Sequence, residues 1–274
     1  MVGLQYYASD IHVLDRMHMK AKSSAALEYI DRPVTALEDE YPEGFIDDWH
    51  HHKRCQLVYA AKGVINVMTE EGSYVLPPQR ALWIPAGISH MATCKSDVSL
   101  RTLYIDPVVR TNLPGKCRVI EVSELLRALI LQAMKIPRKY DDNSREGRIM
   151  RLILDEIELM PIEPLLIPLP DDKRLAQVCQ DFLSDPTQEK DLTCCASDAG
   201  MSRRTFTRLF RQQTSMSFSA WRQHARLVEA LSRLSEGEPI TTVAFDVGYN
   251  SSSAFTSMFR KTFGVPPSKY FKDQ

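Results

Sequence analysis

A six-residue near-repeat is the feature that most constrains how this chain can fold. The segment Phe206–Arg211 reads FTRLFR, and 49 residues further along the segment Phe255–Arg260 reads FTSMFR. In each copy the apolar residues stand at positions i, i+3 and i+4, which is the spacing of one face of an α-helix. The chain is therefore expected to build the same kind of amphipathic helix twice, with these apolar residues pointing inward.

The residues in front of the first copy predict a helix-turn-helix. A short helix is expected over residues 192–199, and Gly200 after it permits a left-handed turn. Ser202 is a suitable N-cap for a second helix over residues 203–213. In this motif the second helix enters the major groove of DNA.

The second copy has the same layout. Residues 240–247 predict a short helix, and Gly248 supplies the turn. Asn250 or Ser251 caps a longer helix, which Gly264 ends. The chain thus predicts two helix-turn-helix units.

A single helix is predicted between the two units, over residues 218–235. At 1.5 Å per residue its length would be about 27 Å. That length would separate the two reading helices by about one duplex turn, ~34 Å. One chain is then expected to occupy two successive segments of the major groove.

The distribution of charge indicates contact with a polyanion. Residues 199–272 hold 11 basic and 4 acidic residues, whereas residues 1–169 hold 20 basic and 23 acidic residues. Such an asymmetry is typical of a chain whose basic part meets nucleic acid.

The basic residues also lie where a reading surface needs them. On the predicted helix of the first unit the outward face carries arginines, among them Arg204 and Arg208, which can contact guanine. The second copy has Ser253 and Ser257 at the matching positions. Because the inward residues repeat and these outward residues differ, the two units are expected to share a core and to read different bases.

The first half of the chain has a different pattern. Over residues 49–106 short β-rich runs alternate with turn signals, as in an antiparallel sandwich or small barrel. Helical patterns follow at 121–136 and 144–160, and four prolines within 161–170 predict a semi-rigid connector. We therefore expect a multidomain chain with an N-terminal antiparallel β-barrel (1–120), a helical segment (121–162), and an all-α domain with two helix-turn-helix units joined by a long helix (170–274).

Three segments of the helical half carry a family resemblance: GMSRRTFTRLFRQQT, SFSAWRQHARLVEAL and VAFDVGYNSSSAFTSMFRKTFGVPPSKY. Together they resemble the DNA-binding module of the AraC/XylS family of bacterial transcription regulators, over about residues 170–272. The resemblance implies that bases are read by Arg204, Thr207, Arg208, Ser252, Ser253, Thr256 and Ser257. We expect phosphate contact or support from Ser202, Arg203, Arg211, Asn250, Ser251, Arg260 and Lys261.

The sequence departs from the family pattern in two places. Ser215 stands where the family commonly has a helix-ending glycine, which is expected to cost a little stability. The reading face of the second unit is rich in serine and short. That unit is therefore expected to serve mainly for phosphate contact and shape readout.

The first half resembles the cupin family. Residues 44–63 resemble the first cupin motif, with His50 and His52 in place and Gln56 where a metal-binding cupin commonly has glutamate. The later run PAGISH resembles the second motif and ends in His90. Three imidazoles and one amide oxygen would form a site for zinc, nickel or iron. The alternative is that these polar side chains line a pocket for an organic ligand.

We predict a DNA-binding transcription regulator without catalytic residues, whose barrel senses a small molecule or metal and controls promoter engagement. Promoter DNA is the expected partner, with RNA polymerase as a further one. A homodimer is expected if the helical patterns at 121–136 and 144–160 form its contacts, and those patterns would alternatively pack on their own barrel. The alternative function is a metal-dependent, dioxygenase-like cupin enzyme fused to a DNA-binding module.

The expected location is a bacterial cytoplasm. The six cysteines show no CxxC or zinc-finger spacing, which fits a reducing compartment. No signal-peptide pattern opens the sequence, and no apolar run reaches membrane-spanning length. We therefore expect no membrane partner.

Overall fold

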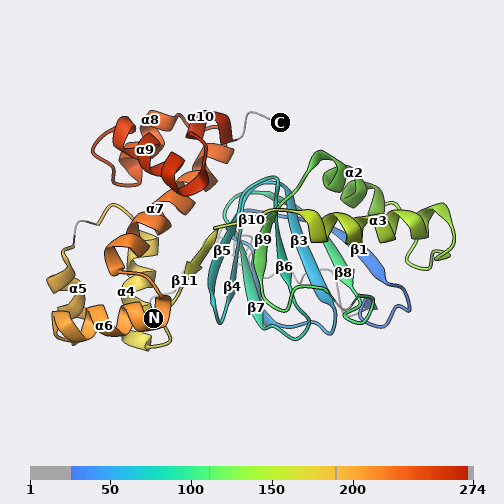
Figure 1. Cartoon of the computed structure of the whole chain (residues 1–274), viewed down its shortest axis with the longest axis horizontal. Coiled ribbons are helices and arrows are strands. Elements are labelled where there is room, and N and C mark those ends of the chain that lie inside the picture. Colours follow the sequence, from blue (N-terminus) through green and yellow to red (C-terminus); the bar gives the residue numbers. More distant parts are fainter. Residues whose placement is uncertain (1–25, 111, 189, 271–274) are drawn as a thin grey trace, which may run out of the picture. The chain divides into compact units, whose positions relative to one another are not determined.

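The computed structural model describes residues 26–110, 112–188 and 190–270. These residues form two compact units (Figure 1). One unit comprises the residues up to 69 together with 76–163, and the other comprises 70–75 together with the residues from 164 onward.

The strands form two antiparallel sheets, in the orders β1-β8-β3-β6-β9-β10 and β11-β5-β4-β7-β2. The long strands β3 and β8 pair in register from Cys55 opposite Ile105 to Ala60 opposite Leu100. The antiparallel β architecture predicted for this half is confirmed. The strands are β1 (Val34–Tyr41), β2 (Ile46–His50), β3 (Cys55–Lys62), β4 (Ile65–Thr69), β5 (Gly72–Leu76), β6 (Arg80–Ile84), β7 (His90–Cys94), β8 (Val98–Ile105), β9 (Arg118–Glu121), β10 (Ile162–Glu163) and β11 (Leu166–Pro168).

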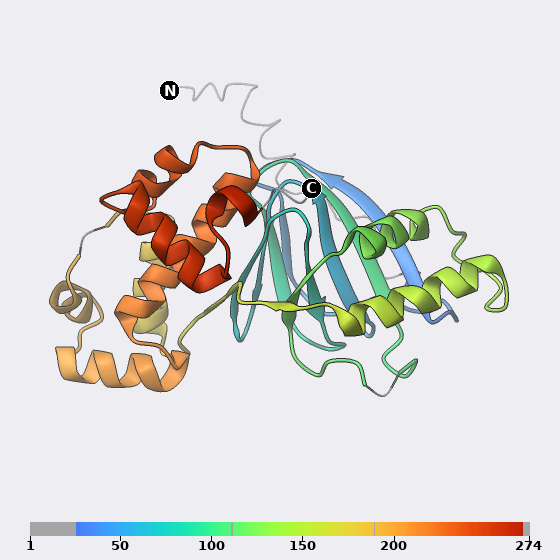
Figure 2. The same ribbon diagram turned by 45° about the horizontal axis from the view of Figure 1, so that its top comes forward.

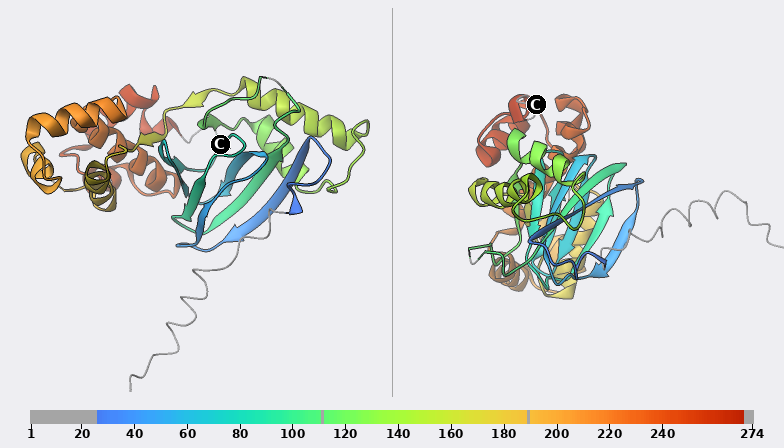
Figure 3. Two further views of the ribbon diagram at one scale, coloured as in Figure 1. Left: turned by 90° about the horizontal axis from the view of Figure 1, so that it is seen from below. Right: turned by 90° about the vertical axis from the view of Figure 1, so that its right-hand side faces the viewer.

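Helices α2 (Glu124–Ala133) and α3 (Arg145–Leu159) cover one face of the six-stranded sheet (Figure 3). Each begins at a serine N-cap, Ser123 or Ser144, whose side chain accepts a main-chain N–H. Trp83 and Leu103 of the sheet are fully buried in the shared core. The helices contribute Leu126, Leu129, Ile130, Ala133, Met150, Ile153, Leu154 and Ile157 to it.

The helical patterns were expected either to form dimer contacts or to pack on their own barrel. Most of their apolar residues pack on their own barrel. Complete burial of one leucine contributes about 1.5–3 kcal/mol, so the helices are held firmly on their own domain. Leu125 of α2 and Leu152 of α3 instead lie on the outward side, with 49% and 40% of their surface exposed. Leu159 at the end of α3 is 73% exposed.

The proline-rich connector contains more structure than predicted. Its first part forms β10, antiparallel to β9, and its second part forms β11, antiparallel to β5. Pro168 is tolerated in β11 because this strand lies at the edge of its sheet, where a missing N–H donor leaves no partner unsatisfied.

The second unit is helical, and α7 runs between its two helix-turn-helix units (Figure 2). The repeated phenylalanines are completely buried: Phe206 and Phe210 in the first unit, Phe255 and Phe259 in the second. Their predicted inward orientation is confirmed. The helices are α4 (Lys173–Ser184), α5 (Leu192–Asp198), α6 (Arg203–Thr214), α7 (Phe218–Ser235), α8 (Ile240–Asp246), α9 (Ser252–Phe263) and α10 (Pro267–Tyr270).

Aromatic side chains pack the first helix-turn-helix unit against the long helix α7. The ring of Phe210 lies 5.1 Å from that of Phe218 and 5.9 Å from that of Trp221, both in edge-to-face geometry. At the end of α6, Ser215 adopts a left-handed backbone with φ of 59°. A side chain in this conformation costs roughly 1 kcal/mol, which is the penalty expected where the family has glycine. No helix in the described residues is long and apolar enough to span a membrane.

Candidate DNA-binding surface and effector site

The first helix-turn-helix forms as the sequence predicts. Gly200 takes a left-handed φ of 63° between α5 and α6. Ser202 caps α6, because its Oγ accepts the main-chain N–H of Thr205 at 3.2 Å. The tight turn thereby presents α6 as a separate, well-anchored helix.

The outward side of α6 is a basic surface. Arg204, Thr207 and Arg208 are all exposed there, as predicted, and so are Ser202, Arg203 and Arg211. No ion pair within the described residues engages the four arginines of this face, so their charges are available to DNA. An open groove on this surface is lined by Leu192, Arg203, Arg204, Thr207, Arg208, Arg211 and Gln212.

Two side chains of this surface already have partners within α6. An Nη1 of Arg208 donates to Oε1 of Gln212 at 3.4 Å, one helical turn further on. The hydroxyl of Thr207 donates to the carbonyl of Arg203 at 2.8 Å. Thr207 therefore offers its methyl group and an acceptor lone pair, rather than a donor, to a base.

The second helix-turn-helix unit presents a less basic surface, with serines where α6 has arginines. Gly248 takes φ of 84°, and Ser251, not Asn250, is the N-cap of α9, accepting the N–H of Ala254 at 3.2 Å. Of the four predicted base readers, Ser253 and Ser257 are exposed, while Ser252 and Thr256 are half-buried. The predicted phosphate contacts Asn250, Ser251, Arg260 and Lys261 are all exposed.

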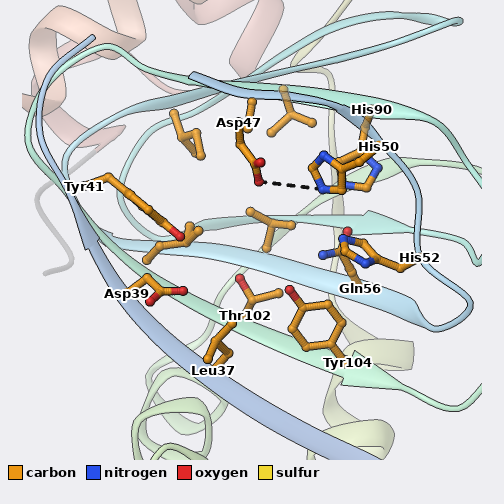
Figure 4. A pocket seen from close by; sticks show the side chains of 15 residues that line it. Leu37, Asp39, Tyr41, Asp47, His50, His52, Gln56, His90, Thr102 and Tyr104 are labelled. Atoms are coloured by element: carbon orange, nitrogen blue, oxygen red, sulfur yellow. Dashed lines mark ion pairs between the residues drawn. The ribbon is translucent and has the colours of Figure 1, made fainter. Parts of the chain in front are cut away.

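Three histidines converge in the other compact unit, between the two β-sheets, as predicted (Figure 4). One ring nitrogen from each of His50, His52 and His90 lies within 4.8 Å of the others. The ring centroids of His50 and His90 are 4.4 Å apart. The neighbouring His51 is exposed and is not part of this cluster.

A bulge in β2 aligns two of these histidines. Asp47 pairs with Ala92 and His50 pairs with His90, so β2 uses one more residue than β7 between the two pairs. Without the extra residue, Trp49 would stand opposite His90. Bulges of this kind commonly re-aim a side chain beside a functional site.

Each imidazole is held through its Nδ1 atom. Nδ1 of His50 donates to the carbonyl of Asp48 at 2.6 Å, and Nδ1 of His90 donates to that of Ile88 at 3.0 Å. Nδ1 of His52 lies 3.4 Å from a carboxylate oxygen of Glu28. These acceptors keep the proton on Nδ1 and leave Nε2 with a lone pair, the usual arrangement of metal-binding histidines.

Burial keeps two imidazoles of this cluster, His52 and His90, electrically neutral. It lowers the pKa of His90 to about 4 and also lowers the pKa of His52. Both imidazoles are therefore uncharged at neutral pH, the form in which histidine binds metal. Nε2 of His52 and Oε1 of Gln56 are buried without a hydrogen-bond partner. Two buried acceptors without a hydrogen-bond donor are costly unless a ligand occupies the site.

The cluster lines one end of a cavity of about 50 Å³ between strands of the two sheets. Asp39 and Tyr41 of β1 line the other end, and Asp47 of β2 lies beside His50 (Figure 4). Tyr41 hydrogen-bonds to Asp39, and burial raises the pKa of both Tyr41 and Asp47. An Oδ2 of Asp47 lies 3.7 Å from Nε2 of His50.

Known proteins resemble this chain in both halves. Residues 195–273 match the family described as a helix-turn-helix domain, and residues 33–157 match the AraC-like ligand binding domain. The HTH-type transcriptional regulator NimR of Escherichia coli K12 is 31% identical over 221 residues, which cover 81% of each chain. The chain belongs to the AraC family of transcriptional regulators. The predicted DNA-binding regulator with an N-terminal effector domain is thereby confirmed.

A second curated regulator and two solved structures also match this chain. The arabinose operon regulatory protein of Escherichia coli K12 is 31% identical over 134 residues, 46% of each chain. The DNA-binding domain of AdpA, solved with a target DNA, covers 35% of this chain and 86% of its own at 32% identity and a TM-score of 0.33. ToxT from Vibrio cholerae covers 87% of this chain and 98% of its own at 13% identity and a TM-score of 0.37.

Several residues around the sites of this AraC-family protein escape prediction from sequence. Asp39, Tyr41 and Asp47 reach the cavity because of sheet register and a bulge, neither of which is written in a local pattern. Glu28 approaches His52 from 24 residues earlier in the chain. Gln212 stands one helical turn after Arg208 on a predicted helix, so its place on the reading surface could have been found from helical spacing.

Proposed function

We propose that this AraC-family regulator senses a divalent transition metal in its β domain and adjusts its affinity for promoter DNA accordingly. The observation that carries the proposal is the set of three imidazoles with one ring nitrogen from each held within 4.8 Å of the others. The hydrogen bonds on the opposite nitrogens and the unsatisfied oxygen of Gln56 support the same reading. Imidazole and oxygen donors suit zinc, nickel and iron.

The size of the cavity favours a metal over an organic effector. Pockets for drug-sized organic ligands measure about 300–1,000 Å³. The cavity of about 50 Å³ has room for an ion and a few water molecules. A drug-sized organic effector, the alternative for this site, would need more room than this cavity offers.

Metal sensing requires that the ion prefer one of two states of the protein. A metal that binds the DNA-competent state and another state equally well shifts nothing. Typical coupling between two sites changes affinity by about 5–150-fold. The expected response is therefore a change of that order in the Kd for the promoter fragment.

The test uses protein purified without a histidine tag. Its metal content is measured by elemental analysis. Its Kd for a promoter fragment is measured by fluorescence anisotropy with and without zinc, nickel, cobalt or iron. His52→Ala should abolish both metal retention and the DNA response. His51→Ala removes an exposed imidazole next to it and should leave both intact. Absence of metal in the wild-type protein under all these conditions would exclude the proposal.

We propose that Arg204, Thr207 and Arg208 read bases from α6. The exposed positions Ser253 and Ser257 of α9 make lesser base contacts, and the half-buried Ser252 and Thr256 support them. The arginines of α6, which form no ion pair within the described residues, and the open groove of the first helix-turn-helix unit support this division of work.

A regulatory role for the metal is also favoured over a catalytic one, because the relatives named above are transcription regulators. The rival function is a dioxygenase-like cupin enzyme fused to a DNA-binding module. Oxygen consumption after addition of ferrous iron, compared between wild type and His52→Ala, would reveal it.

We propose that the chain acts as a homodimer, with α3 contributing the outward side chains of Leu152 and Leu159. Their exposure of 40% and 73% supports this assignment. Two copies would double the DNA footprint and strengthen binding through avidity. Contact with RNA polymerase and a cytoplasmic location stay predictions.

A further inference from the structure

The metal site proposed above lacks a negative charge. Its four donors, the imidazoles of His50, His52 and His90 and the amide of Gln56, are all neutral. A divalent ion among them would keep two positive charges in a largely buried cavity. Burial of an uncompensated charge is strongly unfavourable, so such a site needs an anionic group close by.

One carboxylate stands next to the first of these histidines, His50. Oδ2 of Asp47 lies 3.7 Å from Nε2 of His50, and both side chains line the same cavity (Figure 4). Zinc binds imidazole nitrogen at about 2.0–2.1 Å and carboxylate oxygen at about 2.0–2.2 Å, so two such donors on one ion lie no more than roughly 4.3 Å apart. The separation of Asp47 and His50 falls within this limit.

The bulge in β2 is what brings these two side chains together. Residues separated by three positions in a regular strand point to opposite faces of the sheet. The extra residue between the pairs Asp47–Ala92 and His50–His90 cancels this alternation, so both side chains face the cavity. The bulge therefore positions a carboxylate as well as an imidazole.

We infer that Asp47 supplies the anionic oxygen ligand of the metal site. In metal-binding cupins this ligand is commonly a glutamate, and Gln56 stands at that position here. This inference rests on the proposed metal-sensing function. A ligand set of three histidines and one carboxylate suits zinc, iron, nickel and cobalt in the divalent state. Gln56 then orients the ion or a bound water without neutralising its charge.

A second acidic residue of the cavity provides the matched control. Asp39 comes from β1 and hydrogen-bonds to Tyr41, away from the imidazoles (Figure 4). Asp39→Asn and Asp47→Asn each remove one negative charge from the same cavity, and asparagine at 39 can still accept the hydrogen bond of Tyr41. The pair separates direct coordination from a general electrostatic effect.

The experiment measures Co²⁺ binding to the full chain by competition with a chromophoric chelator and by the visible absorption of the bound ion. Asp47→Asn should weaken binding at least about tenfold and alter the cobalt spectrum. Asp39→Asn should stay within about threefold of wild type and keep its spectrum, and Asp47→Glu should recover part of the loss. Thermal unfolding without metal shows that each variant is folded.

The possible results are distinguishable. Equal losses for both asparagine variants, or wild-type binding by Asp47→Asn, would overturn the role of Asp47 while leaving the metal site in place. Failure of the wild-type protein to bind Co²⁺ at all would instead overturn the metal-sensing function on which the inference depends.

Discussion

Arg208 and Lys261 both lie on exposed helix faces of the DNA-binding unit, and they are expected to contribute to binding in different ways. Arg208 lines the open groove on α6, and a guanidinium there can bind O6 and N7 of guanine together. Lys261 lies near the end of α9, where we predict a phosphate contact.

Replacement of each residue by alanine should separate these roles. Arg208→Ala is expected to cost about 1–3 kcal/mol at the cognate site and to relax base preference there, whereas Lys261→Ala should weaken all sequences alike. Titrations of specific and scrambled duplexes measure the difference. A loss for Arg208→Ala that is the same on both duplexes would contradict its assignment to base reading.

Gly248 and Gly200 occupy the same place in the two turns but have different surroundings. Both have a left-handed backbone, which costs any other residue roughly 1 kcal/mol. A Cβ atom on Gly248 would lie 2.9 Å from Cζ of Arg226, whereas one on Gly200 would meet nothing within 4 Å. Arg226 also donates to the carbonyl of Gly248 at 3.3 Å, so it cannot move away without loss.

The two glycines therefore form a matched pair for mutation. Gly200→Ala is expected to lower the free energy of unfolding by about 1 kcal/mol, and Gly248→Ala by about 2–3 kcal/mol because of the added clash. Urea unfolding of both variants measures the difference. Equal destabilisation would mean that Arg226 yields at little cost.

At the scale of whole elements, two side chains of α7 form hydrogen bonds to the main chain of β11. Nε1 of Trp221 donates to the carbonyl of Pro168 at 2.7 Å, and Nε2 of His224 bonds to that of Leu166 at 2.9 Å. Burial lowers the pKa of His224, so the imidazole is neutral in the folded unit. Protonation of this histidine favours the unfolded chain.

This arrangement predicts a pH dependence of stability. Because the folded pKa of His224 lies below the unfolded value of about 6.5, its contribution is complete above that pH and decreases as the pH falls below it. The difference in unfolding free energy between wild type and His224→Gln should therefore shrink between pH 7.5 and pH 5.5. Glutamine keeps a donor but does not titrate, so parallel pH profiles for the two proteins would contradict this account.

Local patterns predict some elements of this fold and not others. The helix-turn-helix units follow from the spacing of residues such as Phe206 and Phe255 and from the capping serines, because helical contacts are close in sequence. Strands β10 and β11 depend on partners far away in sequence, so the proline-rich segment alone could not reveal them. The three histidines were found through motif spacing. Asp47 was not, because its direction depends on a bulge that only the pairing of β2 with β7 defines.

At the scale of the whole molecule, the proposed dimer predicts a change in assembly. The outward leucines of α3, Leu152 and Leu159, offer apolar surface at one side of the β domain. The double variant Leu152→Glu, Leu159→Glu should be a monomer by analytical ultracentrifugation, with weaker binding to paired promoter sites but unchanged binding to a single site. The same exchange at the exposed Arg151 should leave assembly unchanged. A wild-type protein that is monomeric at micromolar concentration would rule out the dimer.

The separation of a buried phenylalanine face from an exposed polar face in α6 and α9 has a consequence for retargeting. Substitutions at the outward positions change no packed contact, so a lineage of such regulators can drift to new operators without losing its scaffold. A combinatorial library varied at Arg204, Thr207 and Arg208 should accordingly yield folded proteins throughout. Those proteins would differ in the promoters they occupy and hardly at all in melting temperature.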